Sequence, residues 1–130
     1  MIRKLAGLAV GLVTAIALIM VIETLGHSVV PPPAGYDMNA GSALKLPAAN
    51  LMFPVLGWFL GTLAGAVAAL RISRASWTGW AVAALVLLGA IVNFAMITHP
   101  LWVMAAGIVA PLLAGWLAQR WPAASPEPSA

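Results

Sequence analysis

Few side chains in this sequence could do chemistry, and the most informative ones are two histidines with polar neighbours. Glu23 and His27 are four residues apart, so they share one face if a helix extends that far. Asn93 precedes His99 by six residues. Carboxylate and imidazole groups can exchange protons or attract cations. We therefore expect these four side chains to form one polar cluster at the outer mouth of the protein.

The same side chains suggest a divalent metal as an alternative. Zinc takes neutral imidazole and carboxylate ligands in tetrahedral geometry, and the chain offers four: Glu23, His27, Asp37 and His99. Their spacing matches no established zinc pattern. A third interpretation is structural, in which Glu23 pairs with His27 and Asn93 bonds to a neighbouring helix. The sequence requires no cofactor, and zinc is the one it suggests.

Other reactive motifs are absent from the sequence. The chain has no cysteine, which rules out disulfides, thiolate metal sites and cysteine nucleophiles. It has no G-x-S-x-G, no H-E-x-x-H and no phosphate-binding loop. Its basic residues do not cluster into the patch that nucleic acid binding needs. We therefore expect neither an enzyme nor a nucleic-acid-binding protein.

Composition indicates what must position the polar cluster. Of 130 residues, 63% are hydrophobic and 7% are charged, and the mean hydropathy is +1.03. A soluble domain carries about 25% charged residues, so this surface must face lipid. Four apolar runs can each cross about 30 Å of hydrocarbon as a helix. We predict helices at about 5–26, 50–70, 77–97 and 101–118, in an all-α membrane protein with a four-transmembrane-helix bundle as a single domain, residues 1–121.

The cationic residues predict an orientation. Those on one side of the four runs are Arg3, Lys4, Arg71, Arg74 and Arg120, whereas the other side has only Lys45. Cations collect on the cytoplasmic side of membrane proteins. We therefore expect both termini to be cytoplasmic, in a bacterial inner (plasma) membrane. A cleaved signal peptide is disfavoured, because the first apolar run is too long and no A-x-A-like site follows it.

The connections differ greatly in length. The long one, at about 27–49, contains Pro31-Pro32-Pro33, which stops any helix, and it lies on the predicted outer side together with both histidines. The proline-containing tail 122–130 is typical of disorder. Nearly every residue capable of chemistry is thus expected outside the cytoplasm.

Small residues indicate how the helices pack. Gly57, Gly61 and Gly65 follow one another at the four-residue spacing of a glycine zipper. In lipid, close backbone approach across small residues supplies much of the attraction between helices. This stripe builds the bundle of one chain in the simpler interpretation and mediates a homodimer in the other.

Three functional hypotheses follow for a protein embedded in the lipid bilayer. The first is an accessory or scaffolding protein whose outer loop contacts a partner, such as another membrane protein. The second is a small oligomeric transporter or channel, with Glu23, His27, Asn93 and His99 at its outer mouth. The third is an outer-face metal-binding protein. No motif in the sequence selects a substrate or a partner.

Overall fold

The described part of the chain folds into four helices that run alternately up and down. The computed structural model describes residues 1–121, in which α1 (Ile2–Val29), α2 (Ala48–Ser73), α3 (Ser76–Met96) and α4 (Leu101–Arg120) follow in order. All four are long and apolar enough to cross a membrane. The expected all-α bundle of four transmembrane-type helices is therefore confirmed, and this is a multi-pass membrane protein.

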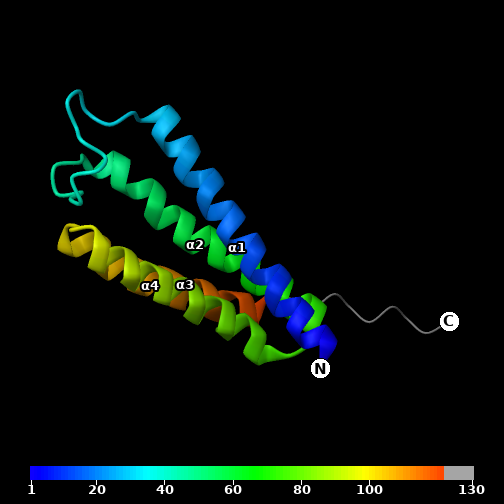
Figure 1. Ribbon diagram of the computed structural model, residues 1–130. Coiled ribbons are helices and arrows are strands. Elements are labelled where there is room, and N and C mark those ends of the chain that lie inside the picture. The colour runs from blue at the N-terminus through cyan, green and yellow to red at the C-terminus, as the bar shows by residue number, and fades with distance from the viewer. Residues whose placement is uncertain (122–130) are drawn as a thin grey trace.

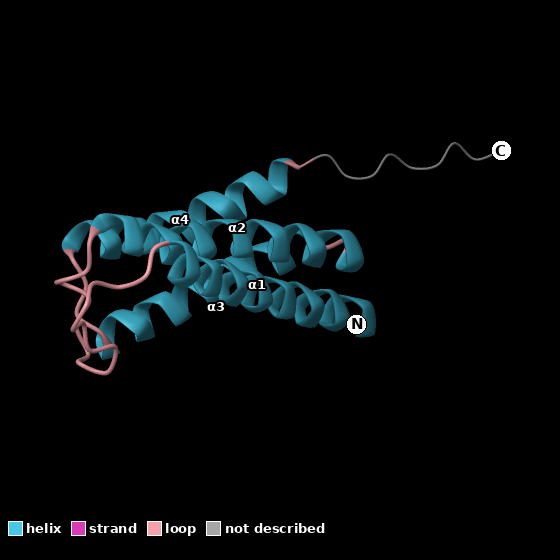
Figure 2. Ribbon diagram, turned by 90° about the horizontal axis from the view of Figure 1, so that it is seen from above, coloured by secondary structure: helices cyan, strands magenta, loops and turns pink. Residues whose placement is uncertain are grey.

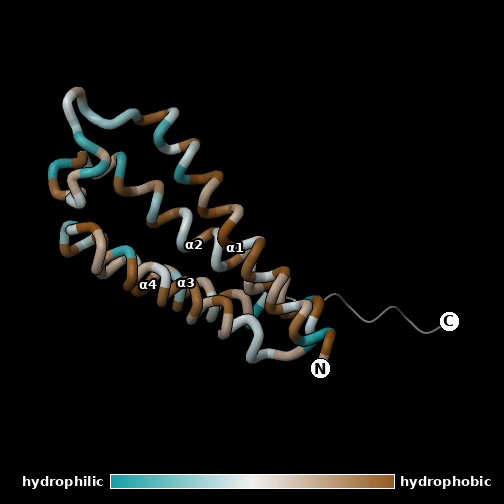
Figure 3. The backbone as a smooth tube through the Cα atoms, viewed as in Figure 1, coloured by the Kyte–Doolittle hydropathy of each residue, from teal (hydrophilic) through white to brown (hydrophobic). Residues whose placement is uncertain are grey.

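The bundle has two chemically different ends. α1 begins and α4 ends at the same end, where Arg3, Arg74 and Arg120 lie, and we call it the arginine end (Figure 1). The opposite end carries His27 and His99, and we call it the histidine end. In the view of Figure 1, α1 and α2 spread apart from α3 and α4 toward the histidine end. Hydrophobic residues run along the helices between the two ends (Figure 3).

The helices extend beyond most of the predicted apolar runs. α1 continues to Val29, three residues past the predicted end at 26, and α2 covers 48–73 instead of 50–70. Hydropathy marks only where side chains are apolar, whereas backbone hydrogen bonding continues through polar residues at helix ends. The long loop therefore covers 30–47, and the predicted disordered tail lies outside the described residues.

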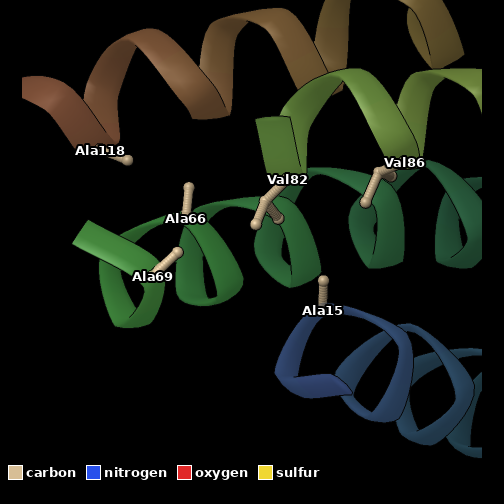
Figure 4. Close-up of a cluster of buried hydrophobic side chains, with 6 residues drawn as sticks. All are labelled: Ala15, Ala66, Ala69, Val82, Val86 and Ala118. Carbon is tan, nitrogen blue, oxygen red and sulfur yellow. The ribbon is translucent and has the colours of Figure 1, made fainter. Parts of the chain in front are cut away.

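The core near the arginine end consists of small side chains from all four helices (Figure 4). Its members are Ala15, Ala66, Ala69, Val82, Val86 and Ala118. Four of them, from α1, α2 and α3, are completely inaccessible to solvent. Such short side chains let the helix backbones approach closely, which is how helices attract one another in lipid. This half of the bundle is therefore tightly closed.

The glycines of α2 pack against α1 of the same chain. A Cβ atom on Gly61 would lie 2.8 Å from the carbonyl oxygen of Ala15, and one on Gly65 would collide with the carbonyl oxygen of Gly11. Gly57 is less crowded, since its Cβ would lie 3.5 Å from the backbone of Ile19. The face that the sequence offered for a homodimer is thus occupied within the monomer.

A hydroxyl pair fixes the turn between α2 and α3 at the arginine end. The buried Ser73 Oγ and Thr78 Oγ1 are 2.7 Å apart, and Ser73 Oγ also accepts a hydrogen bond from the Ala75 amide at 3.0 Å. Arg74 between them adopts a left-handed conformation with φ of 54°. Gln119 Nε2 donates to the Ser76 carbonyl at 2.9 Å, which ties α4 to the same turn.

Candidate functional site

The long loop 30–47 folds back over the histidine end, and we call this segment the cap. Its middle pairs with the α3–α4 turn, because the Ala43 amide donates to the Thr98 carbonyl at 2.7 Å and the Thr98 amide donates to the Gly41 carbonyl at 2.9 Å. Ser42 and Thr98 form an isolated parallel bridge between these bonds. Most of the loop residues gather at this end of the helices (Figure 2). The cap therefore joins the two helix hairpins.

Two side-chain hydrogen bonds hold the cap in shape. The Tyr36 hydroxyl donates to the Ser42 carbonyl at 2.7 Å, across the cap itself. Asn50 Nδ2, in the first turn of α2, donates to the Val30 carbonyl at 2.6 Å, where the cap leaves α1. Both bonds are partly shielded from water, which makes them stronger than exposed ones. The segment expected to be a long loop is thus fastened over the end of the bundle.

A cavity of about 160 Å³ lies beneath the cap. Its walls come from α1, the cap, α2, the end of α3 and the α3–α4 turn. The lining includes every residue of the polar cluster expected from the sequence: Glu23, His27, Asn93 and His99. α1 positions the first two because it extends as a regular helix to Val29. The cap and the α3–α4 turn bring His99 to the same space.

Both histidines are held by backbone carbonyls of their own segments. His27 Nδ1 lies 2.7 Å from the Glu23 carbonyl oxygen, and His99 Nδ1 lies 2.7 Å from the Ile97 carbonyl oxygen. A carbonyl oxygen only accepts hydrogen bonds, so each Nδ1 must carry a proton. In the neutral imidazole the other nitrogen, Nε2, then has a free lone pair. Each ring therefore offers one acceptor to a ligand.

Glu23 and Asn93 keep their hydrogen-bonding capacity for the cavity. Within residues 1–121, neither the Glu23 carboxyl nor the Asn93 side-chain amide has a hydrogen-bond partner. Every fully buried side-chain nitrogen or oxygen atom in this part of the chain does have a partner, so the polar atoms of Glu23 and Asn93 are not fully buried. Their polar atoms therefore lie where water or a ligand reaches them. The expected bond from Asn93 to a neighbouring helix is absent from this described part of the chain.

Aromatic rings form and support part of the cavity wall. Trp58 is buried in the cavity wall, and its ring meets Phe94 edge-on with centroids 5.6 Å apart. Phe94 in turn meets His99 edge-on at 5.4 Å. Gly107 of α4 makes room for both, since a Cβ there would lie 2.5 Å from Phe94 Cζ and 2.7 Å from Trp58 Cζ3. A glycine in α4 therefore positions the wall behind His99.

Sequence reasoning did not single out the aromatic part of the site. Tyr36, Phe53 and Trp58 all line the cavity. Two signals were available, because Tyr36 is the chain's single tyrosine and Trp58 lies inside an apolar run, away from the helix ends where the other tryptophans lie. What the sequence did not reveal is the partner of Trp58, because Gly107 is distant along the chain.

The expected metal site receives no support from this geometry. Among residues 1–121, no group of three or more His, Cys, Asp or Glu side chains could hold a metal ion. Asp37 lies in the cap, outside the cavity lining, and its Oδ1 accepts a hydrogen bond from the Asn39 amide at 2.9 Å. Three of the four suggested ligands thus meet at the cavity, but without the geometry that zinc requires.

The chain matches no known protein-family model, no curated protein and no solved structure. The chemistry of the capped cavity is therefore the main guide to function.

Proposed function

We propose that this protein is an accessory membrane protein that binds a small polar ligand under the cap. The observation that carries this proposal is the cavity at the histidine end, lined by four polar side chains with free hydrogen-bonding groups. Its volume of about 160 Å³ is close to that of an engineered protein cavity that holds benzene, roughly 150 Å³. The ligand is therefore no larger than about one ring.

Packing at the arginine end favours binding over conduction. The cavity opens among the spread helix ends, whereas the small-residue core that includes Ala15, Ala66 and Val82 fills the other half. α1 and α2 are in close backbone contact there, at Gly11 and Gly65. A transporter or channel would need a path through this half. The close helix contacts among residues 1–121 disfavour such a path.

The accessory role would act through the outward side of the cap. Leu44 exposes more than half of its surface, at 56%, and neither it nor the exposed neighbour Lys45 lines the cavity. The inner side of the same segment is held against the α3–α4 turn. A ligand that shifts the cap would thereby change the surface that a partner membrane protein meets.

We further propose that the histidine end faces outward from a bacterial inner membrane, with both termini cytoplasmic. The cation distribution supports this orientation. The exposed tryptophans Trp77, Trp116 and Trp121 at the arginine end suit a headgroup boundary. There Arg120 stacks on Trp116, with its guanidinium carbon 4.0 Å from the ring centroid.

The binding proposal is tested by comparing purified wild type with a variant that carries His27→Ala and His99→Ala. Each ring forms hydrogen bonds only within its own segment, but the His99 ring also packs edge-on against Phe94, so circular dichroism must first show that the variant is folded. We expect a library of small polar fragments to contain members that bind wild type in nanodiscs, measured by ligand-detected NMR, and bind the variant at least about tenfold more weakly. If no fragment distinguishes the two proteins, the proposal is wrong.

A further inference from the structure

The cavity lining is electrostatically one-sided. It contains one carboxyl group, that of Glu23, and no lysine or arginine among the described residues that line it. Lys45 belongs to the cap but is exposed and stands outside the lining. An anionic ligand would lose its hydration and gain no counter-charge, which is costly. The lining therefore selects against anions.

The free hydrogen-bonding groups of the polar cluster Glu23, His27, Asn93 and His99 are mostly acceptors. His27 and His99 have their Nδ1 protons committed to backbone carbonyls, so each neutral ring offers the Nε2 lone pair. An ionised carboxylate at Glu23 accepts and does not donate. Asn93 is the one polar cluster member that can do both. A ligand that satisfies this set must bring several N–H or O–H donors.

The remaining walls are mostly apolar and include three aromatic rings, which suits a cation with a small apolar part. Tyr36, Phe53 and Trp58 contribute to the lining. The face of an aromatic ring attracts a cation, and most strongly when water is excluded. A cavity of about 160 Å³ accommodates a molecule of only a few non-hydrogen atoms up to one ring. The apolar part of the ligand is therefore short.

We propose that the cavity binds a small primary ammonium compound with a short alkyl chain. Glu23 provides the counter-charge, the Nε2 atom of at least one of His27 and His99 accepts an N–H proton, and the ring of Trp58 contacts the alkyl part. This inference rests on the proposed function and names the class of its ligand. A quaternary ammonium fits less well, because it has no N–H to donate to the two imidazoles.

The experiment measures calorimetric binding of four probes to the full-length protein in nanodiscs at about pH 8, where an ordinary imidazole is neutral. Propylammonium carries both the charge and the N–H donors, propanol lacks the charge, propionate reverses it, and tetramethylammonium lacks the donors. We expect propylammonium to bind at least about tenfold more tightly than each of the other three. Propanol or propionate binding as tightly would overturn the inference, because the ligand then needs no positive charge. Equal binding of tetramethylammonium would overturn the role of the two imidazoles.

Glu23→Gln is the decisive variant, and Asp37→Asn is its matched control. Both remove one carboxylate from the same end of the bundle, but only Glu23 lines the cavity. We expect Glu23→Gln to weaken propylammonium binding by about tenfold to a hundredfold and Asp37→Asn to change it less than about twofold. Equal effects would mean that general surface charge attracts the probe, and the inference would fail.

The two proposals fail in distinguishable ways. Fragments that bind in a His27- and His99-dependent manner, without any preference for ammonium, refute the ligand class and leave the binding function standing. Folded protein that binds no fragment at all refutes both.

Discussion

His27 and His99 each direct Nδ1 at a backbone carbonyl 2.7 Å away, and this local contact decides what the rings present to the cavity. The spacing of Glu23 and His27 predicted a shared helix face, and one interpretation of the sequence paired their side chains. The observed bond reaches the Glu23 carbonyl instead, which leaves the carboxyl group free for the cavity. The chemistry of this pair therefore depends on one rotamer of the histidine.

Asn50 is the side chain whose loss should loosen the cap most directly. Asn50→Ala removes the donor to the Val30 carbonyl, and a bond of this kind contributes about 0.5–1.5 kcal/mol. We expect the cap to open more often, so that trypsin cleaves after Lys45, its single target in the cap, roughly 2–10 times faster. Mass spectrometry of the fragment beginning at Leu46 measures this rate in nanodiscs.

Asn39→Ala is the control for that experiment. Asn39 is an exposed asparagine of the cap, and the hydrogen bond at this position comes from its backbone amide, which alanine retains. We expect its cleavage rate to match that of wild type. A rate for Asn50→Ala equal to that of Asn39→Ala would contradict the role given to the bond with Val30.

The helices pack by a rule that the small residues already indicated. α1 meets α2 where Gly11 and Ala15 face Gly61 and Gly65, so backbone lies against backbone. α4 uses glycine differently, because Gly107 leaves space for the rings of Trp58 and Phe94 from two other helices. The first use closes the arginine half of the bundle, and the second shapes the cavity.

Gly65→Ala tests the packing of α1 against α2. The new methyl group would collide with the Gly11 carbonyl oxygen and lie 2.8 Å from the Ala15 Cβ, so the helices must separate. We expect a loss of about 1–3 kcal/mol in the free energy of unfolding, the usual cost of overpacking a core. Unfolding by sodium dodecyl sulfate, followed by far-ultraviolet circular dichroism, gives this value.

Gly89→Ala is the matched control on α3. A Cβ at Gly89 meets nothing within 4 Å, and alanine has a higher helix propensity than glycine by about 1 kcal/mol. We expect this variant to be as stable as wild type or slightly more stable. A comparable loss in both variants would indicate a general sensitivity of the helices to substitution, not a close contact at Gly65.

The whole molecule is asymmetric along its long axis. The arginine end is closed by small side chains and fixed by the buried pair of Ser73 and Thr78. The histidine end is spread, capped and hollow. Binding and partner contact are therefore expected at one end only. Which side of the membrane that end faces decides where its ligand comes from.

The absence of cysteine from the sequence makes the orientation directly testable. Asn39→Cys in the cap and Ser76→Cys at the arginine end each place a single thiol at an exposed position, and neither change alters the distribution of cations. We expect a membrane-impermeant maleimide added to intact bacterial cells to label Asn39→Cys and to label Ser76→Cys only after lysis. The reverse pattern would move the cavity to the cytoplasmic side.

The sequence by itself determined the membrane-spanning class, the number of helices and the faces rich in small residues. These properties follow from composition and from the 3.6-residue period, which are local quantities that need no knowledge of distant contacts. It also indicated that Glu23, His27, Asn93 and His99 belong to the same end of the protein.

Only the tertiary structure decided that these residues surround one cavity beneath a fastened cap. That arrangement depends on contacts between segments far apart in the chain, such as Ala43 with Thr98 and Trp58 with Gly107. Residue types and spacing along one segment do not identify contact partners in distant segments. The same physical reason applies to the predicted metal site. The sequence contains suitable ligands, but whether they come together is a property of the folded chain, and within residues 1–121 they form no group that could hold a metal ion.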